Sequence, residues 1–81
     1  MRKVIGENVR QARLVRGLTQ AGLAEVSGFS QQYISGLEAG QRNPTAISLY
    51  ELSQALSVEV HLLMIDHGDA EWLGYQKPIL G

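Results

Sequence analysis

The segment 20–39 constrains this chain most, because its small and apolar residues have the spacing of two short helices that meet across a tight turn. Ala24 is followed four residues later by Gly28, and Ile34 and Leu37 come six and nine residues after that glycine. Gly28 can adopt the positive φ that the end of the first helix requires. Ala24 is small where the helices touch, and the two larger residues would pack the second helix onto the first. The segment therefore predicts a helix-turn-helix unit.

Apolar periodicity and capping residues predict the boundaries of the first three helices. The first is expected over about residues 4–16, the second from Thr19 to about residue 27, and the third from Ser30 to about residue 39. The hydroxyls of Thr19 and Ser30 can accept from backbone N–H groups at the start of their helices. The glycines expected to end the helices are Gly17, Gly28 and Gly40. The face of the first helix expected to be buried carries Ile5, Val9 and Ala12.

A fourth helix is expected to open at Asn43-Pro44-Thr45, with Pro44 near its first turn. Its buried stripe would be formed by Leu49, Leu52 and Leu56. The segment after Ser57 is ambiguous, because apolar residues alternate from Val58 to Met64. Alternation of this kind is typical of a strand, but a short fifth helix over 59–65 is equally compatible with the sequence.

The last residues of the chain combine glycines with large apolar side chains. The apolar ones are Trp72, Leu73, Tyr75, Ile79 and Leu80. Disordered tails usually lack so many such groups. We therefore divide the chain into a helix-turn-helix domain over residues 1–65 and a C-terminal extension over 66–81. We expect the extension to pack against its own domain, a second subunit or a partner protein.

The composition limits the number of domains, the kinds of metal or disulfide site and the cellular location that we expect. Eighty-one residues make one small domain, and the absence of cysteine excludes disulfides and thiolate metal sites. The longest apolar run, Leu62 to Ile65, is far too short to cross a membrane. The first residues, Met1-Arg2-Lys3, lead into a polar amphipathic segment that does not read as a signal peptide. We expect a cytoplasmic protein without a membrane contact.

Catalysis is not indicated by any group of residues. The candidates that lie near one another in the sequence are His61, Asp66, His67, Asp69 and Glu71. Their spacing matches no established metal-ligand pattern. The glycines lie at predicted helix ends and do not form a phosphate-binding loop. We expect no enzyme activity, no metal and no cofactor.

Charge is distributed unevenly along the chain, although the net charge is only −1. Residues 1–44 carry six Lys or Arg against three Glu, whereas residues 45–81 carry one Lys against five Asp or Glu. The basic half contains the helix-turn-helix, and a solvated face could show the same modest excess. This distribution suits contact between one face and phosphates. A helix-turn-helix places its second helix in the DNA major groove, so we expect double-stranded DNA as the partner.

The pattern GLTQ-x3-A-x3-GFSQQYISGLEAGQRNPT resembles the phage repressor and Cro type of helix-turn-helix protein, the XRE family. The resemblance covers about residues 5–63 and implies an all-α fold, a compact bundle of about five helices followed by the apolar extension. It also implies operator binding, usually as a symmetric dimer, and regulation of transcription.

The resemblance assigns DNA contacts to positions that match the family motif. Gln20 matches a residue that touches the DNA backbone and an outer base, and Tyr33 matches a position near the phosphates. Arg42 and Asn43 match a loop along the backbone. The groove-facing positions of the third helix are matched by Ser30, Gln31, Gln32 and Ser35.

Glutamine is a suitable reader, because its amide can contact N7 and the N6 amino group of adenine together, which discriminates by about 1–3 kcal/mol. Further candidates for phosphate contact are Lys3, Arg10 and Arg16.

Three positions occupied by glycine or serine depart from the family pattern. Gly22 removes a capping box with Thr19, Gly36 removes a longer polar side chain from the third helix, and Ser57 stands where glycine often ends the fourth helix.

Arg13 and Glu38 match an internal ion pair of the family. Arg13 falls on the face of the first helix set by Ile5 and Val9, so its guanidinium should be partly buried and must be paired. Glu38 is the natural partner if the third helix packs across the first. This pair is therefore expected to be structural and not to contact DNA.

The sequence as a whole predicts a sequence-specific transcriptional regulator, a dimeric repressor that reads a palindromic operator with half-sites about 10 bp apart. The dimer surface is expected after the fourth helix, among Val60, Leu62, Leu63, Met64 and the apolar extension. Two alternatives remain open. One is an antitoxin-like DNA-binding protein whose C-terminal segment holds a partner protein. The other is a helix-turn-helix used only as a protein-interaction module.

Overall fold

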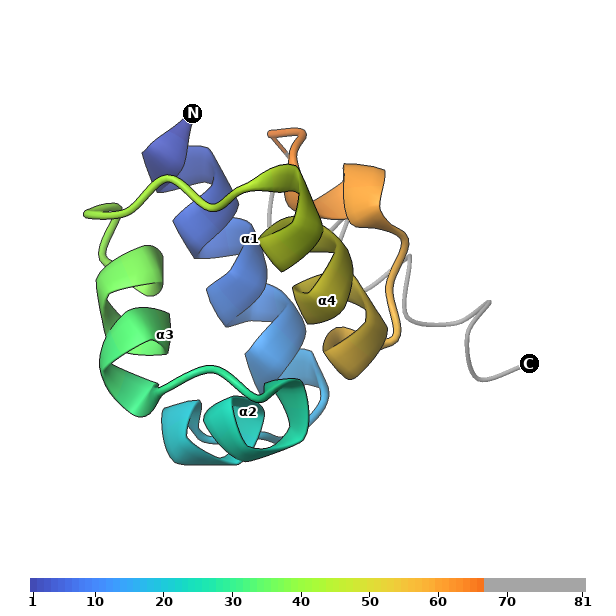
Figure 1. The fold of residues 1–81 in the computed structure, drawn as a ribbon. Helices are drawn as coiled ribbons and strands as arrows, with labels where there is room; N and C mark the ends of the chain where they lie inside the picture. Colours follow the sequence, from blue (N-terminus) through green and yellow to red (C-terminus); the bar gives the residue numbers. More distant parts are fainter. Residues whose placement is uncertain (67–81) are drawn as a thin grey trace.

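The computed structural model describes residues 1–66, which form four α-helices and one 3-10 turn. In chain order these elements are α1 (Arg2–Val15), α2 (Gln20–Ser27), α3 (Gln31–Glu38), α4 (Ala46–Leu56) and η1 (Val60–Leu63). In Figure 1, α1 runs between α3 and α4, α2 closes one end of the bundle, and η1 lies beside α4. The described part of the chain contains no strand, so the predicted all-α class is confirmed.

Side-chain hydroxyls cap the first turn of three helices. Each hydroxyl oxygen accepts from a backbone N–H three residues later, and the Thr45 hydroxyl also donates to Ser48 Oγ at 3.0 Å. The pairs are Gly22 N to Thr19 Oγ1 at 2.9 Å, Tyr33 N to Ser30 Oγ at 3.0 Å and Ser48 N to Thr45 Oγ1 at 3.0 Å. The caps predicted at Thr19 and Ser30 are thereby confirmed. The three glycines predicted to end helices all have positive φ, at Gly17, Gly28 and Gly40.

The start of α4 agrees with the prediction that Asn43-Pro44-Thr45 opens the helix. Thr45 is the cap and the helix begins at Ala46, so Pro44 lies directly before the cap and near the first turn. The hydroxyl of Thr45 satisfies the N–H of Ser48.

The fifth element is neither a strand nor a helix over 59–65. It is a single 3-10 turn, Val60–Leu63, in which the N–H of Leu62 bonds to the Glu59 carbonyl at 3.0 Å. Leu62 and Leu63 are both buried although they are adjacent, which a strand does not allow on one face. The predicted fifth helix is therefore corrected to a tight turn. Apart from Asp66, the predicted extension over 66–81 lies outside the described residues.

The core joins all five elements. Its residues are at most 7% exposed: Ile5, Val9, Ala12, Leu23, Ile34, Leu37, Leu49, Leu52, Leu56, Leu62 and Leu63. The stripes predicted for the first and fourth helices are confirmed. Burial of this apolar surface is the main favourable contribution to folding, at about 25 cal/mol for each Å² removed from water.

A buried asparagine ties η1 to α1. Asn8 is 4% exposed, and its Nδ2 donates to the carbonyl oxygens of Leu63 at 2.9 Å and Ile65 at 2.7 Å. Leu63 is the last residue of η1 and Ile65 lies two residues beyond it, where backbone carbonyls lack partners within the helix. The asparagine therefore holds the end of η1 against the first helix.

Arg16 performs a similar task at the end of α4. Its Nε donates to the Leu56 carbonyl at 2.7 Å and its Nη2 to the Ser57 carbonyl at 2.9 Å. Ser57 itself has a φ of 58°, in the left-handed region that glycine favours. Two donors of Arg16, a candidate phosphate contact in the sequence, thus support the C-terminus of α4.

Gly6 marks the closest approach of α1 and α3. A Cβ atom on Gly6 would collide with the carbonyl oxygen of Leu37 and lie 3.0 Å from that of Glu38, both of which are backbone atoms. Glycine is normally unfavourable inside a helix, and here it allows the N-terminal half of α1 to lie against the end of α3.

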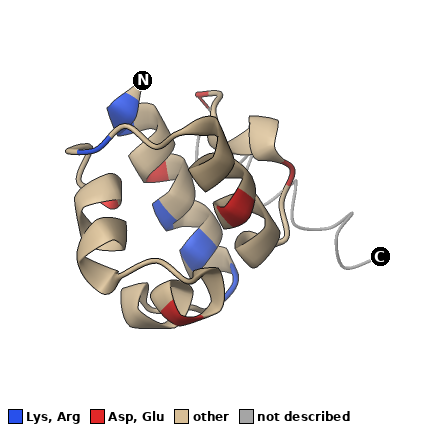
Figure 2. Cartoon of the chain, viewed as in Figure 1, with Lys and Arg blue, Asp and Glu red and all other residues tan. Residues whose placement is uncertain are grey.

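The charged residues of the described chain lie mostly outside α3. Figure 2 shows basic residues on α1 and in the loop before α4, whereas α3 carries a single charged residue, Glu38, at its end. After Arg42 the described residues contain acidic side chains but no Lys or Arg. The uneven charge along the sequence therefore places the basic residues on or just after α1 and in the loop before α4, and leaves the later elements with acidic residues but no Lys or Arg.

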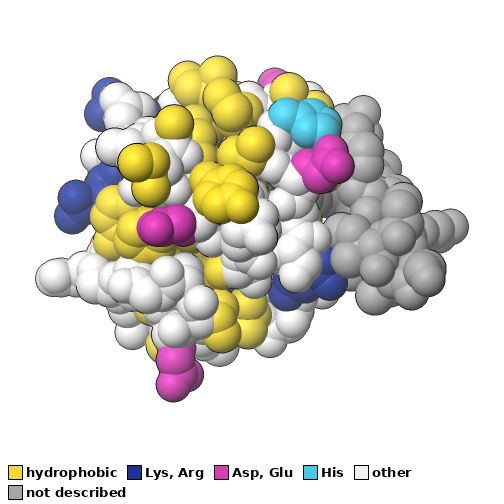
Figure 3. Space-filling view, turned by 45° about the vertical axis from the view of Figure 1, so that its right-hand side comes forward, with side chains coloured by type: hydrophobic (Ala, Val, Ile, Leu, Met, Phe, Trp, Pro, Cys, Tyr) yellow, Lys and Arg dark blue, Asp and Glu magenta, His cyan; other side chains and the backbone are white. Residues whose placement is uncertain are grey.

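Hydrophobic side chains gather on the surface over α4 and η1 (Figure 3). The large exposed ones there are Ile47 at 72%, Tyr50 at 57%, Val60 at 37% and Met64 at 41%. We call these four residues the α4–η1 apolar face. Among residues 1–66, no helix has the length and hydropathy needed to span a membrane.

The close approach at Gly6 predicts that Gly6→Ala lowers the free energy of unfolding by about 1–3 kcal/mol or more, because rigid backbone must move to admit the methyl group. Urea denaturation followed by circular dichroism measures this change. Gly22→Ala is the control, since the nearest atoms to its added methyl group are side-chain atoms of Leu18 and Thr19. Equal stabilities for the two variants would contradict the close approach.

Candidate nucleic-acid interface

The third helix has a buried side and an exposed side. Ile34 and Leu37 are 0% exposed in the core, whereas Gln31, Gln32 and Ser35 are exposed. Helical geometry places the three polar residues together on the side away from Ile34. We call Gln31, Gln32 and Ser35 the outer face of α3. No part of residues 1–66 covers these side chains.

Two other predicted contacts lie at the start of α3. The hydroxyl oxygen of Ser30 is engaged as the helix cap, so its own O–H proton is the group left for another acceptor. Tyr33 is half-buried, and its ring stacks on Phe29 with centroids 4.8 Å apart and planes 21° apart. Both rings pack against the core, which fixes the tyrosine beside the outer face of α3.

The loop after α3 brings Arg42 back to this helix. Gly40 turns the chain with a φ of 76°. The Arg42 Cζ then lies 5.4 Å from the centroid of the Tyr33 ring, a cation–π geometry. Asn43 follows and is exposed. The residues that line a shallow pocket here are Gln32, Ser35, Gly36, Gln41 and Arg42.

Lys3 lies close to the same loop. A Cβ atom on Gly40 would be 3.0 Å from Lys3 Cγ, so the stem of this lysine packs against the turn. Arg10 is further along α1 and forms an exposed ion pair with Glu7, with 3.7 Å between Nη1 and Oε2. Sequence reasoning did not find the contact between Lys3 and Gly40, because it depends on where α1 crosses the end of α3.

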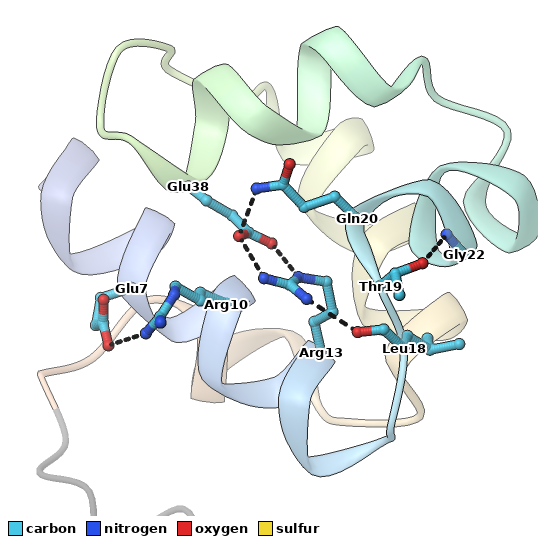
Figure 4. Close-up of polar contacts among 8 residues, drawn as sticks. All are labelled: Glu7, Arg10, Arg13, Leu18, Thr19, Gln20, Gly22 and Glu38. Atoms are coloured by element: carbon cyan, nitrogen blue, oxygen red, sulfur yellow. Dashed lines mark hydrogen bonds and ion pairs between the residues drawn. The ribbon is translucent and has the colours of Figure 1, made fainter.

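A buried network connects the interface to the core (Figure 4). Arg13 donates from Nε to Glu38 Oε2 at 2.7 Å and from Nη2 to Oε1 at 3.0 Å. Its Nη1 donates to the Leu18 carbonyl at 2.9 Å. The Arg13 and Glu38 side chains are 10% and 4% exposed. The predicted ion pair between α1 and the end of α3 is confirmed.

Gln20 belongs to the same network. Its Nε2 donates to Glu38 Oε1 at 3.1 Å, so one predicted DNA contact is held by the buried carboxylate. The carboxylate can only accept, and this fixes which end of the amide faces inward. Figure 4 shows the side chains of Gln20 and Arg13 reaching Glu38 from different elements.

The groups suited to metal binding do not come together in the described part of the chain. Residues 1–66 contain no cluster of three His, Cys, Asp or Glu side chains that could hold an ion. Of the acidic and histidine residues weighed in the sequence, His67, Asp69 and Glu71 lie outside the described residues.

Comparison with known proteins adds to this geometry. The model of the HTH_3 helix-turn-helix family matches residues 9–63. The chain belongs to this helix-turn-helix family. The match spans every described element except the first half of α1, and it agrees with the resemblance seen in the sequence motifs.

Individual helix-turn-helix relatives are also similar over most of the chain. An uncharacterised HTH-type transcriptional regulator, y4dJ of Sinorhizobium fredii, is 59% identical over 58 residues, which are 72% of this chain and 75% of that protein. The control protein C.SmaI of Serratia marcescens is 37% identical over 68 residues, 84% of this chain and 81% of that protein. The first is named as a transcriptional regulator and the second as a control protein.

A solved structure extends the comparison to a protein–DNA complex. The restriction-modification controller protein C.Esp1396I, solved as a tetramer with its natural 35 base-pair operator, superimposes with a TM-score of 0.68. Its sequence is 30% identical, and the match covers 99% of this chain and 95% of that one.

The buried ion pair predicts that Glu38→Gln lowers the unfolding midpoint more than Glu7→Gln does. Removal of one buried partner leaves the Arg13 charge uncompensated and should cost about 3 kcal/mol. The exposed pair with Arg10 should contribute less than about 1 kcal/mol. Thermal denaturation of the two variants measures the difference, and equal midpoints would remove the stabilising role of the pair.

Proposed function

We propose that this chain is a transcriptional regulator that binds operator DNA and reads it with α3 in the major groove. A single observation carries the proposal: the outer face of α3 presents amide and hydroxyl groups to solvent while the other side of the helix is buried. Amides on an exposed helix can donate to and accept from base edges at once. The helix-turn-helix family and the operator complex of a 30% identical controller protein support the same function.

The proposed contacts divide into two groups. Gln31, Gln32 and Ser35 would read base edges from the outer face of α3, with Ser30 at the start of the helix. Gln20 would contact the backbone and an outer base, while its amide stays bonded to Glu38. The residues proposed to lie near phosphates are Tyr33, Arg42 and Asn43. Because α3 carries no Lys or Arg, attraction to the backbone must come from residues around it.

We also propose that two copies act together as a symmetric dimer on a palindromic site. One short helix reads few bases, and a two-fold pair reads twice as many. The related controller protein was solved as a tetramer on its operator, which supports assembly on DNA. A repressor of this kind would work in the cytoplasm. Its relatives come from bacteria, in which transcription is regulated in that compartment.

The α4–η1 apolar face is the surface we propose for the second copy. Four candidates were named from the sequence, and two of them, Leu62 and Leu63, are 7% and 0% exposed and close the monomer core. They are therefore not available for a partner. Val60 and Met64 remain on the surface, and Ile47 and Tyr50 of α4 join them. The sequence missed the last two because only the buried stripe of that helix was considered. The extension over 66–81 remains a proposed dimer or partner contact.

The reading residues predict the behaviour of the double variant Gln31→Ala, Gln32→Ala. Affinity for an operator selected by the wild-type protein should fall about tenfold or more, since one bidentate base contact discriminates by about 1–3 kcal/mol. Binding to random DNA should change little, because it depends on phosphate contacts. Fluorescence anisotropy with labelled duplexes measures both affinities.

Gln11→Ala, which removes an amide from α1, is the matched control and should keep operator affinity. Unchanged specificity in the double variant would contradict the assignment of the readers. A wild-type protein that selects no DNA sequence would instead favour the protein-interaction module. Co-purification with a neighbouring gene product, together with operator binding, would favour the antitoxin-like alternative.

The proposed dimer predicts that Ile47→Glu combined with Tyr50→Glu gives a monomer, because two charges would have to be buried at the interface. Sedimentation velocity over a range of protein concentrations measures the change. Val26→Glu places the same charge at an exposed apolar position of α2 and should leave the dimer intact. A dimer that survives the double substitution would exclude this face as the interface.

A further inference from the structure

A glycine on α3 leaves room for a side chain from the following loop. Helical spacing places Gly36 next to Gln32 and Ser35, away from the buried Ile34. A Cβ atom on Gly36 would lie 2.9 Å from Nε of Arg42, and 3.4 and 3.5 Å from its Cδ and Cγ. The Arg42 side chain therefore crosses α3 directly over the glycine, and a larger residue at that position would displace it.

An aromatic stack supports the charged end of the same side chain. The guanidinium carbon of Arg42 lies 5.4 Å from the Tyr33 centroid, and the Tyr33 ring stacks on Phe29 at 4.8 Å. Both rings pack against the core. Arg42 is therefore held at two points, its stem by the gap at Gly36 and its guanidinium by a ring that cannot move freely.

This arrangement leaves the N–H groups of Arg42 available. Within residues 1–66 the arginine has no ion pair and no hydrogen bond, because its contacts use the stem and the flat face of the guanidinium. The described side chains that share its shallow pocket are amides and a hydroxyl, with no carboxylate among them. An exposed arginine without an acidic partner is free to bind an acceptor on a ligand.

We propose that Gly36 and Tyr33 form a seat that holds Arg42 on the outer side of α3, so that Arg42 reads a guanine where the helix itself has no side chain. The proposal rests on the proposed DNA-binding function and deepens it. Gly36 acts as a positioning residue, and Arg42 determines specificity at one base pair of each half-site.

The chemistry of the seat favours a base over a phosphate. A guanidinium offers two parallel N–H groups that match O6 and N7 of guanine. A phosphate needs only a nearby positive charge, which an extended arginine or a lysine supplies equally well. Arg42 is instead folded over α3 beside Gln32 and Ser35, the residues proposed to read bases. This differs from the backbone role that the family resemblance implied for Arg42.

The seat can be tested without DNA. NMR of the wild-type protein should show the side-chain protons of Arg42 shifted upfield by the Tyr33 ring, and Gly36→Ala should return them toward free arginine values. The variant should unfold at the same or a higher temperature, since alanine is more favourable than glycine inside a helix. Unshifted Arg42 protons in the wild-type protein would overturn the seat.

Selection from random duplexes tests the reading of a guanine. The wild-type motif should contain a guanine in each half-site whose preference is lost in both Gly36→Ala and Arg42→Lys, with the other positions unchanged. Affinity for the wild-type operator should fall about tenfold or more in both variants, as expected for one bidentate contact. Gly22→Ala, a glycine to alanine change inside α2, should retain the complete motif.

Three results would overturn the proposal. The first is a Gly36→Ala variant that keeps the wild-type motif and affinity. The second is an Arg42→Ala variant that weakens all sequences equally and lowers the salt slope by about one, which is the behaviour of a phosphate contact. In both cases loss of specificity in Gln31→Ala, Gln32→Ala would show that the proposed function still stands. The third is a wild-type protein that selects no sequence, which removes the function and this inference together.

Discussion

The contact between α1 and α3 determines which side of the third helix faces outward. Gly6 allows the two backbones to approach, and the Arg13–Glu38 pair joins the same end of α3 to α1 about two turns further along α1. The first contact is steric and the second is electrostatic, so together they restrain both the distance and the rotation between the helices. Any relaxation here would turn α3, which would move its outer face relative to the rest of the bundle and shift Ile34 and Leu37 in the core.

The Glu38 carboxylate links this packing to the surface. It accepts from Arg13 in the core and from Gln20 at the start of α2, so one buried charge orients side chains with different tasks. Side chains also bond to backbone groups at the ends of other elements. Asn8 and Arg16 each use side-chain donors to satisfy backbone carbonyls at the ends of η1 and α4. Asn8 and Arg13, two of the buried polar residues among residues 1–66, thus close a helix end or pair with a charge.

Sequence alone predicted what depends on neighbouring residues along the chain. The hydroxyl caps, the glycines with positive φ and the leucine stripe of α4 follow from local rules, and the family motif supplied the Arg13–Glu38 pair. Features set by the distance between elements were missed, namely the need for glycine at position 6 and the use of Arg16. The alternation after Ser57 left a strand and a short helix open because η1 is too short for either period to be recognised. For the site, the motif named residues, but it could not foresee that Arg42 folds over Gly36.

The outer face of α3 has a consequence for how such domains diverge. Gln31, Gln32 and Ser35 are exposed, and no hydrogen bond joins them to the remainder of residues 1–66 through their side chains. Exchanging these side chains would therefore leave the scaffold unweakened. Under the proposed function, a duplicated copy of this gene would acquire a new DNA target by single substitutions at these positions, and each variant protein would stay folded while selection acts on it.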